Sequence, residues 1–176
     1  MRRVVTGVNA DGRSVFVSDG DVAPIELSVL PGPSFHRLWG DDAVPHLPTD
    51  GTPPAQPMYF PPAGGYRVGF FTLPPAGAPV PDGLDPRAVV AELREKVPGM
   101  VDVMEPGHPG MHTTDTVDLD LVISGECWLE LDDGEEVRLG PGDSVVQNGT
   151  RHAWHNRSTT EPCVLFVALI GANRTA

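Results

Sequence analysis

The chain has little positive charge and no long hydrophobic run. Its 176 residues include 12 Lys and Arg against 24 Asp and Glu, which gives a formal net charge of −12. An excess of acidic side chains argues against a nucleic-acid backbone as partner and is typical of a surface that keeps a protein in solution. No segment approaches the roughly 18 apolar residues that a membrane-spanning helix requires. The sequence therefore predicts neither a nucleic acid nor a membrane as partner.

Signals for export and for two kinds of catalysis are also missing. Residues 1–6 lack the apolar core of a secretion signal, so we expect a cytoplasmic protein. The two cysteines, Cys127 and Cys163, fall in predicted strands, which favours buried free thiols, although the two positions leave a disulfide open. Ser124 lacks the Gly-x-Ser-x-Gly context of a hydrolase nucleophile, and no glycine loop for phosphate is present.

Glycine and proline are abundant, with 20 of each, and they separate short alternating segments. Asp133-Gly134 lies between residues 127–131 and 135–139, and it favours the positive φ angles of a type I′ hairpin turn. Further turns are predicted at Ser124-Gly125 and at 140–143. Strands of about five to seven residues between such turns are typical of an all-β sandwich or barrel.

The first hundred residues predict more strands, a long loop and one helix. Asp85 is a cap for a helix over 85–96, with Pro86 at the first helical position. Near the other end of the chain, residues 163–170 are almost all apolar, which is typical of a strand buried on both faces. Residues 44–62 are rich in Pro and Gly and should lie over a surface as a loop. Other strands are expected at 3–7, 14–18, 25–30, 35–39 and 66–73.

Two spaced motifs occupy residues 107–125 and 142–156. In the first, His112 is followed by Thr114, Asp118 and, seven residues later, Gly125; in the second, Gly142 precedes His152 and Asn156. This arrangement resembles the two motifs of the cupin superfamily, small jelly-roll barrels that often hold a divalent metal. Thr114 stands where those motifs have a second His, and Asp118 stands where they have Glu. Residues 148–150 lack the usual Pro and are one residue short.

The resemblance implies one domain over residues 1–176, an all-β cupin jelly-roll barrel with one short helix. Residues 66–176 would form the barrel, and residues 1–65 would form an N-terminal arm of strands and Pro-rich loop. It also implies that the strand face with Asp118 and Asp120 points inward, so that the alternating leucines and Ile123 lie outside and need a cover. A second subunit or the N-terminal arm would supply this cover, and we predict a homodimer.

The resemblance makes His112, Asp118 and His152 the metal ligands. The even separation of His112 and Asp118 also puts both on one face of a regular strand. Two His and one carboxylate suit Fe(II) or Zn(II) with open coordination positions, and Ni and Mn are further options. A metal-free barrel that uses these residues as polar pocket groups is the alternative.

Five other residues are candidates for the site. Thr114 would hydrogen-bond a metal water or the substrate. Asp115 would act as general base or, if the loop after His112 bulges, would replace Asp118 as the ligand. Asp120, Trp154 and Arg151 are expected in the substrate pocket, where Arg151 would meet an anionic group.

Three functions fit these expectations. The first is a metal-dependent enzyme that dehydrates, isomerises or decarboxylates an oxygenated small molecule by Lewis-acid and proton-transfer chemistry. The second is a non-haem Fe(II) dioxygenase with a two-His, one-carboxylate site. The third is a ligand-binding barrel without catalysis. We favour the first because the changed ligand set departs from the usual cupin pattern.

Overall fold

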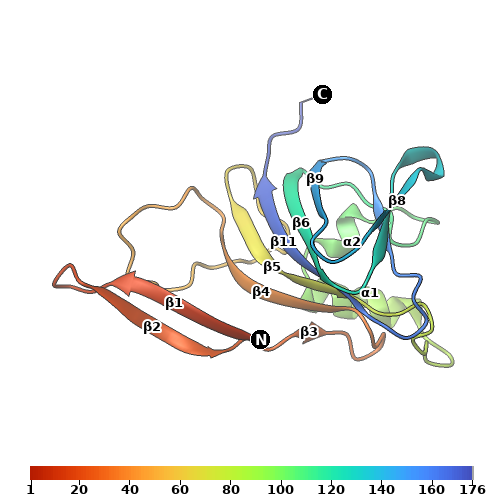
Figure 1. Cartoon of the computed structure of the whole chain (residues 1–176), viewed down its shortest axis with the longest axis horizontal. Helices are drawn as coiled ribbons and strands as arrows, with labels where there is room; N and C mark the ends of the chain where they lie inside the picture. Colours follow the sequence, from red (N-terminus) through yellow and green to blue (C-terminus); the bar gives the residue numbers. More distant parts are fainter. Residues whose placement is uncertain (176) are drawn as a thin grey trace.

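Strands dominate the computed structural model, which describes residues 1–175 (Figure 1). A six-stranded sheet has the order β3-β4-β5-β11-β6-β9, a three-stranded sheet has the order β10-β7-β8, and β1 and β2 form a separate hairpin. All neighbouring strands are antiparallel, as the short turns predict. The strands are β1 (Arg2–Val8), β2 (Ser14–Asp21), β3 (Ile25–Glu26), β4 (Ser34–Asp41), β5 (Tyr66–Leu73), β6 (Thr116–Ser124), β7 (Cys127–Glu130), β8 (Glu136–Leu139), β9 (Ser144–Asn148), β10 (Ala153–His155) and β11 (Cys163–Gly171).

The most apolar strand, β11, lies in the middle of the large sheet. It pairs with β5 on one side and β6 on the other, so its backbone groups are bonded along both edges. Leu165 and Leu169 point inward and are buried, whereas Phe166 and Ile170 point to the opposite face. This position explains the almost uninterrupted apolar run.

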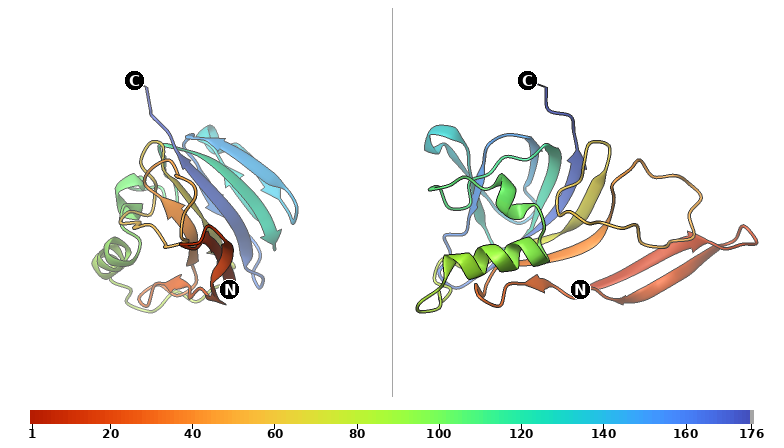
Figure 2. Two further views of the ribbon diagram at one scale, coloured as in Figure 1. Left: turned by 90° about the vertical axis from the view of Figure 1, so that its left-hand side faces the viewer. Right: turned by 180° about the vertical axis from the view of Figure 1, so that it is seen from behind.

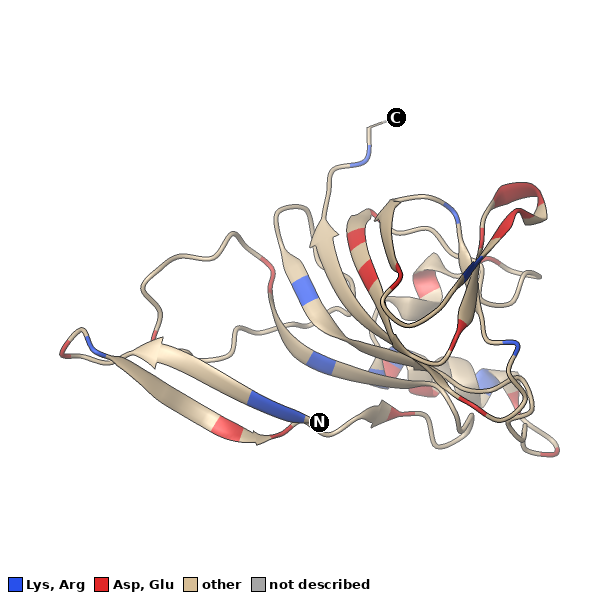
Figure 3. Cartoon of the chain, viewed as in Figure 1, with Lys and Arg blue, Asp and Glu red and all other residues tan. Residues whose placement is uncertain are grey.

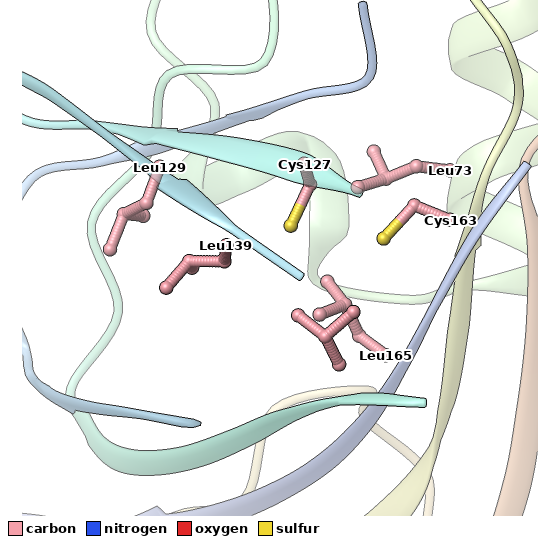
Figure 4. Close-up of a cluster of buried hydrophobic side chains, with 7 residues drawn as sticks. Leu73, Cys127, Leu129, Leu139, Cys163 and Leu165 are labelled. Carbon is pink, nitrogen blue, oxygen red and sulfur yellow. The ribbon is translucent and has the colours of Figure 1, made fainter. Parts of the chain in front are cut away.

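A compact hydrophobic core fills the space between the two sheets (Figure 4). Leu165 is completely buried there, and burial of one such side chain contributes about 1.5–3 kcal/mol. Cys127 and Cys163 lie in the same core, and both are free thiols. The predicted buried free thiols are therefore confirmed. The remaining core members are Leu73, Val122, Leu129 and Leu139.

The predicted helix is α1 (Pro86–Lys96), and it begins as expected. The Asp85 carboxylate accepts a hydrogen bond from the backbone N–H of Arg87, and Pro86 occupies the first turn. A one-turn helix that was not predicted, α2 (Met100–Val103), follows directly. Both helices lie on the inner side of the large sheet (Figure 2). Within the described residues, no helix has the length and hydropathy needed to span a membrane.

A local turn explains one confirmed prediction, and a contact with α1 explains one error in a predicted strand. Asp133 and Gly134 have φ angles of 58° and 74° and join β7 to β8 through the short 3₁₀ turn Asp132–Gly134, which confirms the hairpin. The strand predicted at 25–30 is wrong in length, since β3 ends at Glu26. Beyond it, the backbone N–H groups of Ser28 and Val29 donate to the Glu92 carboxylate on α1 instead of to a neighbouring strand.

The N-terminal hairpin projects from the body of the molecule (Figures 1 and 2). Every residue of β2 is exposed, and the hairpin contacts the body through the segment around Gly51, where the backbone N–H of Val8 donates to Thr49. β4 is part of the large sheet, so this sheet already includes residues that lie well before residue 65 in the sequence. The projecting part is therefore the β1–β2 hairpin.

Candidate functional site

A cavity of about 420 Å³ lies between the inner face of the large sheet, the two helices and β10. This volume lies in the range of small-molecule sites. Most of its wall is apolar or aromatic and includes Phe35, Tyr59, Phe71 and Trp154. Four ionisable side chains interrupt this wall, namely His112, Asp118, Asp120 and His152.

His112 and His152 face each other across a short antiparallel bridge. The backbone N–H of each residue donates to the carbonyl of the other at 2.9 Å, and this pairing holds the two rings with their centroids 4.1 Å apart. The Nδ1 atoms lie 2.8 Å and 2.9 Å from the carbonyl oxygens of Gly110 and Thr150. Because a carbonyl oxygen can only accept, Nδ1 carries the proton on both rings, and the Nε2 lone pairs are left for a ligand.

Burial keeps both imidazoles neutral. It lowers the pKa of His112, and together with the neighbouring His112 ring it lowers the pKa of His152 to about 4. A neutral imidazole is the form that binds a metal ion. The two rings therefore need no deprotonation at neutral pH before they can act as ligands.

Asp118 and Asp120 point inward from β6, with side chains that are almost completely buried. Burial raises the pKa of Asp118 to about 6; burial and the charge of Asp118 raise the pKa of Asp120 to about 8. At neutral pH, Asp118 is therefore mostly ionised and Asp120 is protonated. Oδ1 of Asp118 has no hydrogen-bond partner within residues 1–175, which is costly for a buried carboxylate.

Comparison with known proteins agrees with this geometry. The family model described as "Cupin domain" matches residues 100–169. The phomopsin biosynthesis cluster protein C' of Diaporthe leptostromiformis is 34% identical over 160 residues, which cover 90% of this chain and 71% of that protein. The chain belongs to the cupin superfamily.

The chain is also similar to a second protein and to a solved structure. A cupin-domain-containing oxidoreductase of Aspergillus ruber is 31% identical over 173 residues, 95% of this cupin and 71% of that protein. Among solved structures, the polyketide cyclase RemF of Streptomyces resistomycificus is 17% identical, with 85% of this chain and 73% of that chain covered and a TM-score of 0.46. The antiparallel sheets of this chain and its family membership identify the fold as the all-β cupin jelly roll.

The polar residues of the cupin cavity fit a divalent metal by their chemistry. Two free Nε2 atoms and the unpartnered Oδ1 of Asp118 form a two-His, one-carboxylate donor set. The three donor atoms do not all lie within 4.8 Å of one another in the described chain.

A second group of potential ligands lies outside the cavity. The side chains of Glu130, Glu136 and His155 have donor atoms within 4.8 Å of one another. His155 Nε2 lies 2.6 Å from Oε2 of Glu130, and Arg157 Nη2 donates to both carboxylate oxygens of Glu136 at 2.6 Å. Each of the two directly opposed carboxylates of β7 and β8 therefore has a hydrogen-bonding partner, His155 for Glu130 and Arg157 for Glu136.

Three predicted site residues do not line the cavity. The Thr114 hydroxyl is buried and accepts a hydrogen bond from Thr116. Asp115 is exposed and forms an ion pair with Arg174, which also donates to the carbonyl oxygen of Thr114. Arg151 forms ion pairs with Glu105 and Asp132.

Their positions follow from the local backbone. β6 begins only at Thr116, and the segment between His112 and β6 passes along the surface beside residues 172–174. The other predicted residues, His112, Asp118, Asp120, His152 and Trp154, are brought together in the cavity.

Sequence reasoning missed Tyr59 and Gln147. Tyr59 comes from the Pro-rich loop, where no periodicity indicates which side chains point inward; burial raises the pKa of its hydroxyl, which stays protonated. Gln147 lies directly opposite Asp118 on β9, is buried, and its Nε2 has no hydrogen-bond partner in the described chain. Its alternation with Val145 was a usable signal, because residues two apart share a strand face.

Proposed function

We propose that this cupin is a small-molecule enzyme that uses a divalent metal held by His112, His152 and Asp118. The observation that supports the proposal is the orientation of the site: both Nδ1 atoms are bonded to backbone carbonyls, so that both Nε2 atoms are free beside an unpartnered buried carboxylate oxygen. Such fixed tautomers are typical of metal-ligating histidines. A ligand-binding barrel without catalysis would not require them.

The substrate class follows from the cavity wall. Aromatic and aliphatic side chains surround the polar cluster, and within the described chain the lining contains no Lys or Arg. Away from the proposed metal ion, an anionic group would therefore meet buried carboxylates without a compensating cation. We infer an uncharged, largely apolar substrate, such as an aromatic ring system, with an oxygen atom that reaches the polar cluster.

The protein residues have distinct roles in this proposal. A bound divalent ion would supply Lewis-acid polarisation of a carbonyl or enolate oxygen. Asp120 points inward beside Asp118, and burial raises its pKa in the metal-free chain, so it would donate a hydrogen bond or a proton to that oxygen. The apolar wall with Phe71 and Trp154 orients the ring and excludes water, which strengthens each electrostatic contact. Dehydration, isomerisation and decarboxylation can each use this combination.

An oxidative reaction is the second candidate. It is supported by the donor set, which is the one used by non-haem Fe(II) oxygenases, and by the description of the Aspergillus ruber relative as an oxidoreductase. The two candidates differ in the metal and in oxygen consumption. Iron together with substrate-dependent oxygen uptake would favour oxidation, whereas zinc or nickel without oxygen uptake would favour the first proposal.

Metal content per chain, measured on protein purified without chelator, tests the site. We expect the His152→Ala variant to lose the metal and the His155→Ala variant to retain it, because His155 belongs to the ion-paired group outside the cavity. The two variants remove the same kind of side chain three residues apart, so they are a matched pair. Metal loss in the His155 variant alone would reject the cavity site, and full occupancy in both would reject both histidine sites.

A further inference from the structure

Gln147 is a buried polar side chain beside the proposed metal site. It lies on β9 directly opposite Asp118 on β6, and the two residues are 2% and 4% exposed. Because side chains alternate along β9, Gln147 shares the inner side of this strand with Val145. Residues that are directly opposed in an antiparallel pair have Cβ atoms about 4.5–5.5 Å apart. Gln147 and Asp118 are therefore cross-strand neighbours on the inner face of the large sheet.

The two side chains have complementary atoms without partners. Within residues 1–175, Nε2 of Gln147 has no acceptor and Oδ1 of Asp118 has no donor. In the same part of the chain, Gln147 has the only such donor on the two strands that flank β6. A buried polar atom without a partner is costly, because it has lost its hydrogen bonds to water. One hydrogen bond from the Gln147 amide to the Asp118 carboxylate would satisfy both atoms.

Gln147 lies behind the wall of the cavity. Asp118 lines the cavity together with His112 and His152, whereas Gln147 does not line it. The amide is therefore not placed to bind a substrate in the cavity. Any effect of Gln147 on the site has to pass through its neighbour Asp118.

An amide suits this position because it is a neutral donor. Asp118 and Asp120 are the two acidic residues of β6 in Figure 3, and the neighbouring β9 has no charged residue. A Lys or Arg at position 147 would neutralise Asp118 and repel a cation, whereas an amide leaves the negative charge in place. A carboxylate has about four lone-pair positions, so one hydrogen bond from an amide leaves it able to bind a metal ion.

We propose that Gln147 is a positioning residue of the metal site, with its Nε2–H group donating to the Asp118 carboxylate and holding it for the divalent ion. This inference rests on the proposed function, in which Asp118 is a ligand. Hydrogen bonds to a ligating side chain fix its orientation, and loss of such a partner lowers metal affinity about 10–100-fold. Gln147 thereby determines how tightly the site holds its metal without contacting the substrate.

Isothermal titration of the metal-free chain with zinc tests the role of the amide. Gln147→Met keeps a side chain of similar length and volume but removes the donor. We expect it to raise the zinc dissociation constant about 10–100-fold. The matched control is Gln56→Met, because the Gln56 side chain does not line the cavity and its backbone carbonyl keeps the hydrogen bond from Arg37. This control should bind zinc as wild type does.

Three further measurements separate a positioning role from a purely structural one. The urea midpoint of the metal-free chain should not fall in Gln147→Met, because the lost donor has no partner there. With Co(II) bound, the visible absorption spectrum should change in Gln147→Met and not in Gln56→Met, since it reports ligand geometry. In an Asp118→Ala background, Gln147→Met should change zinc affinity less than about twofold, because its effect passes through Asp118.

The outcomes distinguish this inference from the proposed function. A Gln147→Met chain that binds zinc as tightly as wild type would overturn the inference and leave the metal site in place, whether or not its urea midpoint falls. An equal loss of affinity with and without the Asp118 carboxylate would also overturn it. A wild-type chain that binds no divalent ion would reject the proposed metal site, and the inference with it.

Discussion

The two faces of β6 have the reverse of the usual polarity. Asp118 and Asp120 are buried on the inner face, whereas Leu119 and Leu121, on the outer face, are partly exposed. Burial of two carboxylates is unfavourable, and the raised pKa values of the aspartates report this cost. The comparison shows that alternation along a strand identifies two faces but does not identify the interior. In this cupin the polar face is the candidate chemical site and the apolar face is the candidate contact surface.

The largest effect should come from removing the inner carboxylate. We expect Asp118→Ala to weaken divalent metal binding by about 100-fold or more, because even partners outside the ligand sphere change metal affinity 10–100-fold. Asp115→Ala is the matched control, since its carboxylate is exposed and paired with Arg174, and it should bind the metal as wild type does. Isothermal titration with zinc measures both, and equal affinities in all three proteins would remove Asp118 from the site.

Truncation of one leucine on each face sharpens the same comparison through stability. Leu165→Ala on the inner side leaves a cavity in the closed core and should reduce the free energy of unfolding by about 2–5 kcal/mol. Leu119→Ala on the outer face, where this side chain is 49% exposed, should change it by no more than about 0.5 kcal/mol. Urea unfolding measures both changes. Equal losses would mean that the outer face is as closely packed as the core within one chain.

The smallest effect concerns Asp120 and pH in the metal-free protein. Its pKa is about 8 in the folded chain against 3.8 for an ordinary Asp, so the folded state holds a proton that the unfolded state releases. The associated stability is complete below about pH 4 and is lost as pH rises through about 8. Asp120→Asn removes this dependence.

From pH 5 to pH 8, Asp120→Asn should therefore gain about 1–3 kcal/mol relative to wild type, which corresponds to roughly 2–12 °C in Tm for a chain of this size. Thermal unfolding by circular dichroism, with EDTA present, measures the difference. Asp115→Asn is the control for an exposed carboxylate. Parallel Tm–pH curves for wild type and Asp120→Asn would show that Asp120 is ionised at neutral pH.

Much of the fold could be predicted because the signals are local. The Asp85 cap and the positive φ angles at Asp133 and Gly134 depend on a few adjacent residues, and both were found as predicted. Along β6, strand geometry alone placed Asp118 and Asp120 on one face. The choice of the inner face required the resemblance to cupins, and the structure confirms it.

What the sequence by itself determined is therefore most of the strands, the α1 helix and the alternation of side chains along a strand, since these follow from backbone geometry over a few residues. It predicted neither β9 nor the short length of β3. Only the tertiary structure decided which loops reach the cavity. Tyr59 enters from a loop without periodicity, while Asp115 and Arg151 are held away from the cavity by ion pairs with residues 59 and 46 positions distant in the chain. Contacts of this range depend on how the sheets close over one another, and no pattern of neighbouring residues specifies them.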